Sequence, residues 1–212
     1  MPTPPTPGRT RLYRGASPEQ RQAERRTQLI KSAIRVYGEK GYRLATVKAV
    51  CEAAGLTERY FYESFANSEE LLVASFQVVS NNLYTRVVEA ARTAPPKRVD
   101  QIHAMLFTYF STLRQEPVSA RMFLLEIRGV SRAVDEAFEA SLLDMGERVA
   151  QVVAPTGTPP DPWLMAGVLG GIMQIATRWI SQGYAPSVEH IVAMALQLTV
   201  PLWKKIKVEP GR

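Results

Sequence analysis

The sequence predicts an all-α fold in two parts, a small N-terminal helical unit and a larger C-terminal one. From Ser17 onward, apolar residues recur at steps of three and four, and capping residues, glycines and prolines punctuate the pattern. Alternating β-branched runs, which indicate strands, are few. The charge divides the chain as well, because residues 1–66 hold twelve Lys/Arg and six Asp/Glu whereas the remainder holds fourteen of each. We therefore predict an N-terminal arm at residues 1–16, one domain at 17–66 and a second domain at 67–212.

The proline-rich residues 1–16 predict a disordered basic arm. They have too little apolar length for a secretory signal. Arg9, Arg11 and Arg14 could follow a phosphate backbone, or they could simply keep the arm soluble. The excess of positive charge in the first third of the chain favours a polyanion as partner, with an ordinary solvated surface as the alternative.

Composition excludes several classes of protein. The single cysteine, Cys51, allows no intrachain disulfide framework, which fits the reducing cytoplasm, and with only two histidines a metal site is not expected. Cys51 is interpreted as a core residue, with a redox sensor as the alternative. The sequence has no phosphate-binding loop, no dinucleotide fingerprint and no recognisable catalytic spacing, so we expect no cofactor and no enzyme. It also lacks the roughly 18 uninterrupted apolar residues of a membrane span, so no membrane partner is expected.

The first helix of the N-terminal domain has several agreeing start signals. Ser17 can cap it, Pro18 fits its first position, and Gln20 can reach back to the cap. Gly41 is placed to end it. Its buried stripe is predicted to consist of Leu29, Ile30, Ala33, Val36 and Tyr37.

Two shorter helices follow, joined by a turn at Gly55. Thr46 and Thr57 are each predicted to cap one of them by accepting a backbone N–H. Two short helices joined in this way form a helix-turn-helix, whose second helix can enter a DNA major groove. The apolar positions of the three-helix core would be Val47, Val50, Ala54, Leu56, Phe61 and Phe65. The residues predicted to lie near base edges are Thr57, Glu58, Arg59 and Tyr60. The hydroxyls of Thr46 and Tyr62 are suited to phosphate contacts.

Residues 29–72 resemble the N-terminal domain of the TetR family of transcriptional regulators. The shared features are an Ala/Leu-rich first helix ending in Gly41-Tyr42, the threonine at Thr46, "AAGLT" at the turn, the "YFYESF" core and the "NSEELL" opening of a fourth helix. The resemblance implies a domain that contacts operator DNA through Thr46, Lys48, Thr57, Arg59, Tyr60 and Tyr62.

Two positions depart from the family pattern. Ser64 stands where a histidine often contacts phosphate, and Ser68 stands where a lysine often does. Serine can still donate one hydrogen bond, so Ser64 is kept among the predicted DNA contacts. Glu58 and Glu63 add negative charge near the DNA. An acidic group there repels phosphate unless it accepts from a cytosine amino group, and Glu63 is interpreted as a solvent-facing residue.

The C-terminal domain is predicted to be helical throughout. Its helices are expected near residues 67–93, 99–114, 118–128, 134–153, 162–182 and 188–205, with a loop at 155–162. Asp161 is expected to cap the helix that begins at Pro162.

Methionine and aromatic side chains in this domain are numerous enough to line a pocket for a small apolar ligand. The residues predicted to line it are Met105, Tyr109, Phe110, Met122, Phe123 and Met173. Such residues at helical spacing also form ordinary cores, and this alternative stays open. The family resemblance implies that a ligand in this domain changes the spacing of two DNA-reading domains.

Three glycines in the helix at 162–182 predict a close approach by another helix, since a glycine inside a helix costs about 1 kcal/mol relative to alanine. The predicted dimer contacts are Gly167, Gly170, Gly171 and Gln174 on that helix, and Ile191, Ala195 and Leu198 on the last one. The resemblance implies a two-fold homodimer at these helices. Packing of the glycines within their own chain is the alternative.

Together these features predict a ligand-responsive, sequence-specific regulator of transcription that binds double-stranded operator DNA as a homodimer. A repressor released from its operator by a small apolar molecule is the expected form. The alternatives are a transcriptional activator, a regulator controlled by a protein partner, a helical carrier protein without DNA recognition, and an α-helical enzyme.

Overall fold

The computed structural model describes residues 17–153 and 161–199, and this part of the chain is all-α, as predicted. The predicted arm at residues 1–16, most of the predicted loop at 155–162 and the end of the last predicted helix lie outside the described residues. No helix in the described part is long and apolar enough to cross a bilayer.

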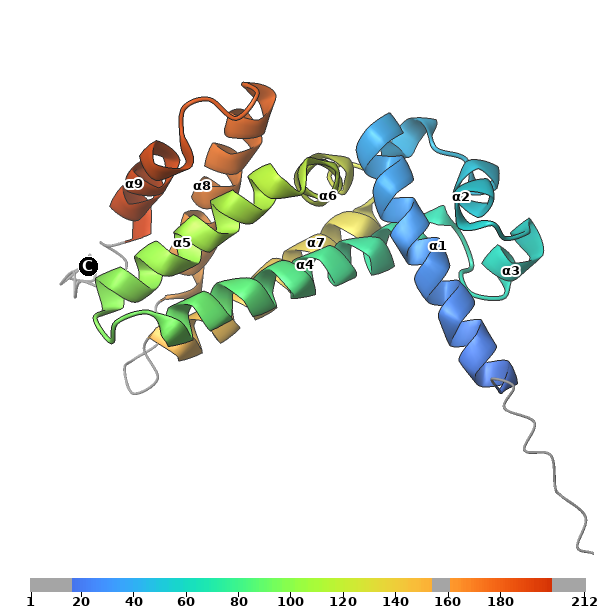
Figure 1. Cartoon of the computed structure of the whole chain (residues 1–212), viewed down its shortest axis with the longest axis horizontal. Helices are drawn as coiled ribbons and strands as arrows, with labels where there is room; N and C mark the ends of the chain where they lie inside the picture. Colours follow the sequence, from blue (N-terminus) through green and yellow to red (C-terminus); the bar gives the residue numbers. More distant parts are fainter. Residues whose placement is uncertain (1–16, 154–160, 200–212) are drawn as a thin grey trace, which may run out of the picture.

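The helices form two groups joined by one long helix. They are α1 (Pro18–Lys40), α2 (Val47–Ala54), α3 (Glu58–Tyr62), α4 (Ser68–Thr93), α5 (Arg98–Gln115), α6 (Pro117–Arg121), α7 (Arg132–Val153), α8 (Pro162–Ser181) and α9 (Val188–Thr199). A 3-10 turn, η1 (Tyr42–Leu44), follows α1, and a π-helical turn, η2 (Met122–Glu126), follows α6. Figure 1 shows α1–α3, hereafter the head, at one end, with α4 leading from it toward α5, α8 and α9 at the other.

Reciprocal hydrogen bonds between Ser17 and Gln20 fix the start of α1. The Gln20 N–H donates to Ser17 Oγ at 3.2 Å, and the Ser17 N–H donates to Gln20 Oε1 at 2.7 Å. Gly41 follows the helix with φ 85°, a value that other residues disfavour. Both predicted ends of this helix are confirmed.

The two predicted threonine caps have different outcomes. Thr46 caps α2 by accepting the Ala49 N–H at 3.1 Å, which confirms the prediction. Thr57 makes no side-chain cap at α3, so that prediction is wrong. The N–H that it would have bound, that of Tyr60, donates instead to the Thr57 carbonyl oxygen at 3.0 Å in a tight first turn.

One apolar core holds α1, α2 and α3 together. Its fully buried members include Leu29, Ala33, Val50, Phe61 and Phe65. Val47, Ala54 and Leu56 are partly buried and pack at its edge. Cys51 is buried, which raises the pKa of its thiol, and the Glu58 carboxylate acts in the same direction. The reactive thiolate is therefore disfavoured, which favours the core role of Cys51 over a redox sensor.

The predicted helix at 118–128 is divided in the structure. Only Pro117–Arg121 is α-helical, and the next five residues form the π-helical turn η2. Three consecutive residues of η2, Met122, Phe123 and Leu124, are all buried. The 3.6-residue repeat of an α-helix does not place three consecutive side chains on one face, and the wider π turn breaks that repeat.

The C-terminal domain, α4–α9, is anchored by Trp179 at the end of α8. The Trp179 Nε1–H donates to the Pro186 carbonyl oxygen at 2.7 Å. Its ring meets the rings of Phe110 and Tyr184 edge-on, at centroid distances of 5.7 Å and 5.0 Å. At the other end of α8, Asp161 caps the helix as predicted, accepting the Trp163 N–H at 2.8 Å. These contacts fix α8 and its connection to α9 against α5.

Candidate DNA-binding surface and ligand cavity

Gly55 allows the turn between α2 and α3. Its φ of 66° and ψ of 29° are left-handed, and the next residue, Leu56, donates its N–H to the Cys51 carbonyl oxygen at 2.9 Å. Because α2 ends so sharply, α3 begins at Glu58 and runs outward. Figure 1 shows α3 at the outer edge of the head, away from the C-terminal domain. The arrangement is that of a helix-turn-helix with an exposed second helix.

Most of the predicted DNA contacts lie on the exposed surface of the head. These are Thr46, Lys48, Thr57, Glu58, Arg59 and Tyr62. Tyr62 is 61% exposed, which is unusual for a large ring without a partner to cover it. Tyr60 is half-buried, since the Arg25 guanidinium on α1 lies 4.4 Å from the centre of its ring.

Glu63 is the centre of an ion-pair cluster that the sequence pattern did not indicate. Its carboxylate lies 3.0 Å from Arg59 Nε and 3.7 Å from Arg25 Nη2. The Glu63 side chain is 35% exposed, whereas that of Arg59 is 84% exposed. Glu63 is exposed, as expected from the sequence, and it also joins α1 to α3 through its ion pairs with Arg25 and Arg59. The sequence of α3 alone could not predict the pair with Arg25, because Arg25 lies on α1.

Ser64 does not present its hydroxyl to solvent, in contrast to its predicted contact with phosphate. Its Oγ is buried and has no hydrogen-bond partner within the described residues. The chain turns here, because the Ser64 N–H donates to the Phe61 carbonyl oxygen at 2.9 Å, and this turn carries the side chain inward. Ser68, at the start of α4, accepts a hydrogen bond from the Tyr42 hydroxyl at 3.4 Å.

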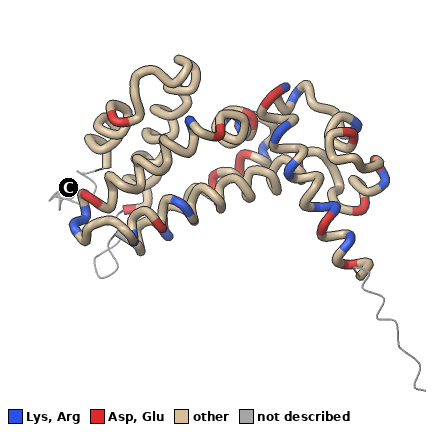
Figure 2. Tube along the Cα trace, viewed as in Figure 1, with Lys and Arg blue, Asp and Glu red and all other residues tan. Residues whose placement is uncertain are grey.

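The charge of the head is moderate. Residues 17–66 carry nine Lys/Arg and six Asp/Glu, so half of the excess positive charge in the first third belongs to the arm at 1–16. Figure 2 shows basic and acidic residues interspersed over α1–α3. Lys48 lies 4.0 Å from Glu52, and Arg59 is paired as described above. Any attraction of the head for a phosphate backbone therefore depends on how these ion pairs rearrange.

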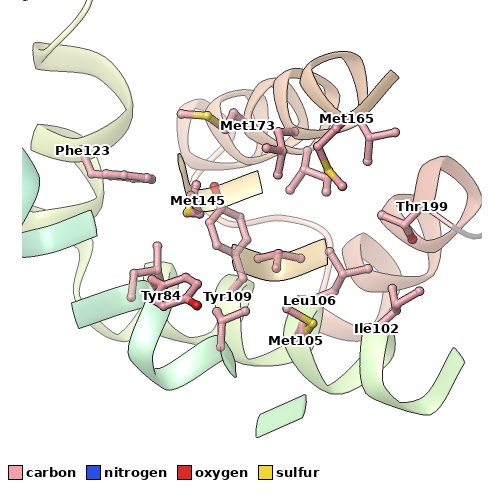
Figure 3. A pocket seen from close by; sticks show the side chains of 16 residues that line it. Tyr84, Ile102, Met105, Leu106, Tyr109, Phe123, Met145, Met165, Met173 and Thr199 are labelled. Carbon is pink, nitrogen blue, oxygen red and sulfur yellow. The ribbon is translucent and has the colours of Figure 1, made fainter. Parts of the chain in front are cut away.

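The C-terminal domain contains an apolar cavity of about 100 Å³ between α4, α5, η2, α7, α8 and α9 (Figure 3). Four of the predicted ligand residues line it: Met105, Tyr109, Phe123 and Met173. The other two do not, because Phe110 and Met122 are fully buried in the surrounding core. Met145 and Met165 add two more methionines to the wall. Met145 was not predicted, because its place on α7 follows only from how that helix packs.

Tyr109 brings an unpartnered hydroxyl to this cavity. Its Oη is buried and has no hydrogen-bond partner within the described residues. Burial raises the pKa of the Tyr109 phenol, with a smaller opposing effect of Arg128, so the group is neutral at physiological pH. The hydroxyl of Thr199, also on the wall, lies 3.3 Å from the Ala195 carbonyl oxygen and 3.2 Å from that of Leu196, and is thereby satisfied.

A second, polar cavity of about 170 Å³ adjoins the first between α4 and α7. It shares Tyr84 and Met145 with the apolar cavity. Its wall includes Arg148, which pairs with Asp144 and lies 5.4 Å from the centre of the Tyr84 ring. Tyr84 and Met145 therefore separate an apolar space from a polar one.

A set of polar contacts joins the head to the C-terminal domain. Glu126 Oε2 accepts the Tyr42 N–H at 2.8 Å, and Arg121 Nε donates to the Gly38 carbonyl oxygen at 3.1 Å. Gly38 itself lies so close to α6 that a Cβ there would collide with the Val118 carbonyl oxygen. The π-helical turn η2 thus ends in a residue that binds the head, while Phe123 on the same turn lines the apolar cavity.

The predicted dimer residues divide between two environments. Gly167, Gly170, Gln174 and Leu198 are on the exposed or half-buried outer side of α8 and α9. In contrast, Ile191 and Ala195 are buried within the chain, because α9 turns that face toward α5. Gly171 serves packing within the chain, since a Cβ there would lie 3.1 Å from Leu198 Cδ1. Met194, at 40% exposure, adds an apolar side chain to the outer side.

Comparison with known proteins agrees with this geometry. The sequence profile of the bacterial regulatory proteins of the tetR family matches residues 29–74. The transcriptional activator FasR of Mycolicibacterium smegmatis is 28% identical over 99 residues, which cover 47% of this chain and 45% of that protein. The transcriptional regulator YerO of Bacillus subtilis is 28% identical over 79 residues, 36% of this chain and 27% of that protein. The matched segments thus span less than half the length of these curated relatives.

Solved structures extend the likeness to the whole fold. The fatty acid degradation regulator FadR from Bacillus halodurans has a TM-score of 0.71 at 18% identity, covering 92% of this chain and 100% of that one. The regulator FadR from Bacillus subtilis, in complex with stearoyl-CoA, has a TM-score of 0.68 at 19% identity, covering 81% and 96%. At this identity the likeness concerns the fold.

The exposed α2–α3 unit and the separate helical domain define a two-part helix-turn-helix fold. The matched profile makes the assignment more specific: residues 29–74 belong to the tetR family of bacterial regulatory proteins. The curated relatives that match are transcriptional regulators rather than enzymes.

Proposed function

We propose that this protein is a sequence-specific, DNA-binding regulator of transcription, which acts as a homodimer and responds to a mainly apolar ligand in the cavity of its C-terminal domain. The observation that carries the proposal is the continuity of η2. Its Phe123 lines the cavity and its Glu126 binds the backbone of the head, three residues further along. A change in the cavity therefore has a short physical route to the orientation of α3.

The head would bind DNA by placing the first turn of α3 in the major groove. Thr57, Glu58 and Arg59 are exposed there and can reach base edges. Thr46, Lys48 and Tyr62 are exposed around them and suit phosphate contacts. α3 has only five residues, so one head offers few contacts and would bind weakly.

A homodimer would supply the second head. Two heads about one helical turn of DNA apart read two half-sites of a palindrome. The outer side of α8 and α9, with Gly170, Gln174, Met194 and Leu198, is the surface we assign to this contact. Gly167 and Gly170 have open space where a side chain would be, which lets a partner helix approach closely.

The ligand would be recognised chiefly by its apolar part. The wall of the cavity is built from aliphatic, aromatic and methionine side chains, and methionine adapts to irregular shapes. The relative FadR from Bacillus subtilis was solved with stearoyl-CoA, which makes acyl compounds reasonable candidates for this chain. A volume of about 100 Å³ is too small for a long acyl chain, so such a ligand would need a wider cavity.

The difference in size between the cavity and such a ligand would couple ligand binding to a change of conformation. A ligand that fits only a widened cavity selects the conformation in which α7, α8 or η2 has moved. If that conformation holds the heads at the wrong spacing, ligand and operator oppose each other, and the opposition is reciprocal. Release can raise or lower transcription according to where the operator lies. The expectation of a repressor is therefore one of two forms, and the relative FasR is an activator.

Selection from a randomised duplex library tests the DNA-reading part. The purified protein should enrich a palindrome whose half-sites lie about one helical turn apart. Arg59→Ala should change the enriched bases, whereas Tyr62→Phe should enrich the same bases with weaker binding overall. Enrichment of no sequence by the wild-type protein would favour a helical carrier without DNA recognition.

A further inference from the structure

We propose that Tyr109 is a specificity-determining residue, and that the cavity takes a mainly apolar ligand with one neutral oxygen that accepts a hydrogen bond from the Tyr109 hydroxyl. This inference rests on the proposed function in one respect, that the cavity is a ligand site. It adds the chemical class of the ligand, which the apolar wall alone does not give.

The first observation is the position of the hydroxyl. Tyr109 is 9% exposed, and its Oη is buried without a hydrogen-bond partner in the described part of the chain. Figure 3 shows the ring inside the cavity, with the hydroxyl pointing toward Met145. A buried hydroxyl without a partner destabilises a fold relative to phenylalanine at the same place. Packing therefore gives no reason for tyrosine here, whereas a ligand oxygen does.

The second observation is that the other oxygens of the wall are differently placed. The Thr199 hydroxyl bonds to carbonyl oxygens of its own helix. Tyr84 is half-buried and also borders the polar cavity, where Arg148 lies over its ring. Tyr109 is thus the hydroxyl that a ligand oxygen deep in the apolar cavity would meet.

The lack of cationic side chains on the described cavity wall favours a ligand with a neutral oxygen over one with an anionic oxygen. No Lys, Arg or His belongs to the cavity wall among the described residues. A carboxylate would lose its hydration there without gaining a cation, which is strongly unfavourable. A carbonyl oxygen accepts one hydrogen bond from a neutral phenol and keeps the rest of the ligand apolar. The ligand class is therefore a ketone, ester or thioester with its carbonyl within the apolar cavity.

Two probes of nearly equal shape test this assignment. The cavity of about 100 Å³ is in the range that binds a single small ring. Cyclohexanone carries the carbonyl oxygen, and methylenecyclohexane replaces that oxygen with CH2. Binding of each is followed by the ¹³C methyl signals of methionine, because Met105, Met145, Met165 and Met173 line the cavity.

The measurement is a double cycle of two probes and two proteins, wild type and Tyr109→Phe. We expect Tyr109→Phe to weaken binding of cyclohexanone about tenfold and to leave binding of methylenecyclohexane within about twofold. Each probe is compared with itself in the two proteins, so the difference in hydration between the free probes cancels from the result. The control is Tyr184→Phe, which removes a phenol hydroxyl outside the cavity wall and should leave both affinities unchanged. The thermal midpoint of Tyr109→Phe should equal or exceed that of the wild type.

The outcomes separate this inference from the proposed function. If both probes shift the cavity methionines and Tyr109→Phe changes the two affinities equally, the role of Tyr109 is wrong while the cavity remains a ligand site. If neither probe shifts those signals at millimolar concentration, the ligand site and the role of Tyr109 are both wrong. A loss of cyclohexanone binding equally large in Tyr184→Phe would also contradict the assignment.

Discussion

The carboxylate of Glu126 accepts a hydrogen bond from the backbone N–H of Tyr42 at 2.8 Å, across the boundary between the C-terminal domain and the head. Glu126 also lies 3.9 Å from Arg121, whose Nε donates to the Gly38 carbonyl oxygen. Its side chain is only 17% exposed, so water competes weakly for these bonds. The end of α1 is thereby tied to the residues that follow the cavity wall.

Replacing Glu126 should loosen the head without unfolding it. In Glu126→Ala the Tyr42 N–H loses a charged acceptor, so its hydrogen exchange should accelerate by about tenfold. Operator affinity should fall by about 1 kcal/mol, roughly fivefold, because α3 is held less firmly. Amide exchange measured by mass spectrometry and operator titration check these values. Glu136→Ala removes an exposed ion pair on α7 and should change neither, and unchanged exchange at Tyr42 in Glu126→Ala would refute this account of the junction.

Removing the charge of Glu63 should strengthen DNA binding. Glu63→Gln removes the negative charge that holds Arg59 and Arg25, so both guanidiniums become available to phosphates. We expect tighter binding to all duplexes, with a slope of log K against log salt steeper by about one. Salt titrations on specific and scrambled duplexes measure it. If Glu63→Gln changed the affinity only for duplexes that differ at one base position, Glu63 would instead be a residue that contacts a base.

Gly38 should tolerate no side chain. A Cβ in Gly38→Ala would collide with the carbonyl oxygen of Val118, which belongs to the backbone and cannot rotate away. We expect a loss of about 1–3 kcal/mol in the free energy of unfolding. The control is Glu39→Ala at the neighbouring exposed position, which should change the free energy of unfolding by about 0.5 kcal/mol or less. Urea unfolding at equal protein concentration measures both, and equal stability of the two variants would argue against tight α1–α6 packing.

A charge on the outer side of α8 should prevent formation of the proposed dimer. In Gly170→Glu the carboxylate would be buried against the same residue of the second copy, and the two-fold axis doubles the effect. Sedimentation velocity should detect monomer for this variant and dimer for the wild type. Ala140→Glu places the same charge on an exposed position of α7 and should remain dimeric. Dimer formation by Gly170→Glu would move the interface elsewhere.

Local signals in the sequence predicted the helices well. Caps such as Ser17 with Gln20, and Asp161, act within a few residues, so the chain itself contains the partners of each bond. The helix-turn-helix was predictable for the same reason, since Gly55 and the apolar positions around it are all local. The π-helical turn was not, because it depends on what surrounds Met122–Glu126.

The site residues that sequence reasoning placed differently share one physical cause. Periodicity identifies the apolar face of a helix, and it does not say what that face meets. Phe110 and Tyr109 are adjacent on α5, yet Phe110 packs on Trp179 while Tyr109 reaches the cavity. Ile191 and Ala195 likewise follow the helical repeat of α9 and face its own domain. The ion pair of Glu63 with Arg25 was not predicted because Arg25 lies on a different helix.

The central claim, that the head reads DNA, is tested most directly by fluorescence anisotropy. The protein is titrated onto duplex DNA from the region upstream of its own gene and onto a scrambled duplex, across a series of salt concentrations. We predict tight binding to the native duplex that weakens with salt as counterions are released, and much weaker binding to the scrambled duplex. Absence of binding to either duplex, even at low salt, would contradict the claim and favour a carrier protein that only retains the fold.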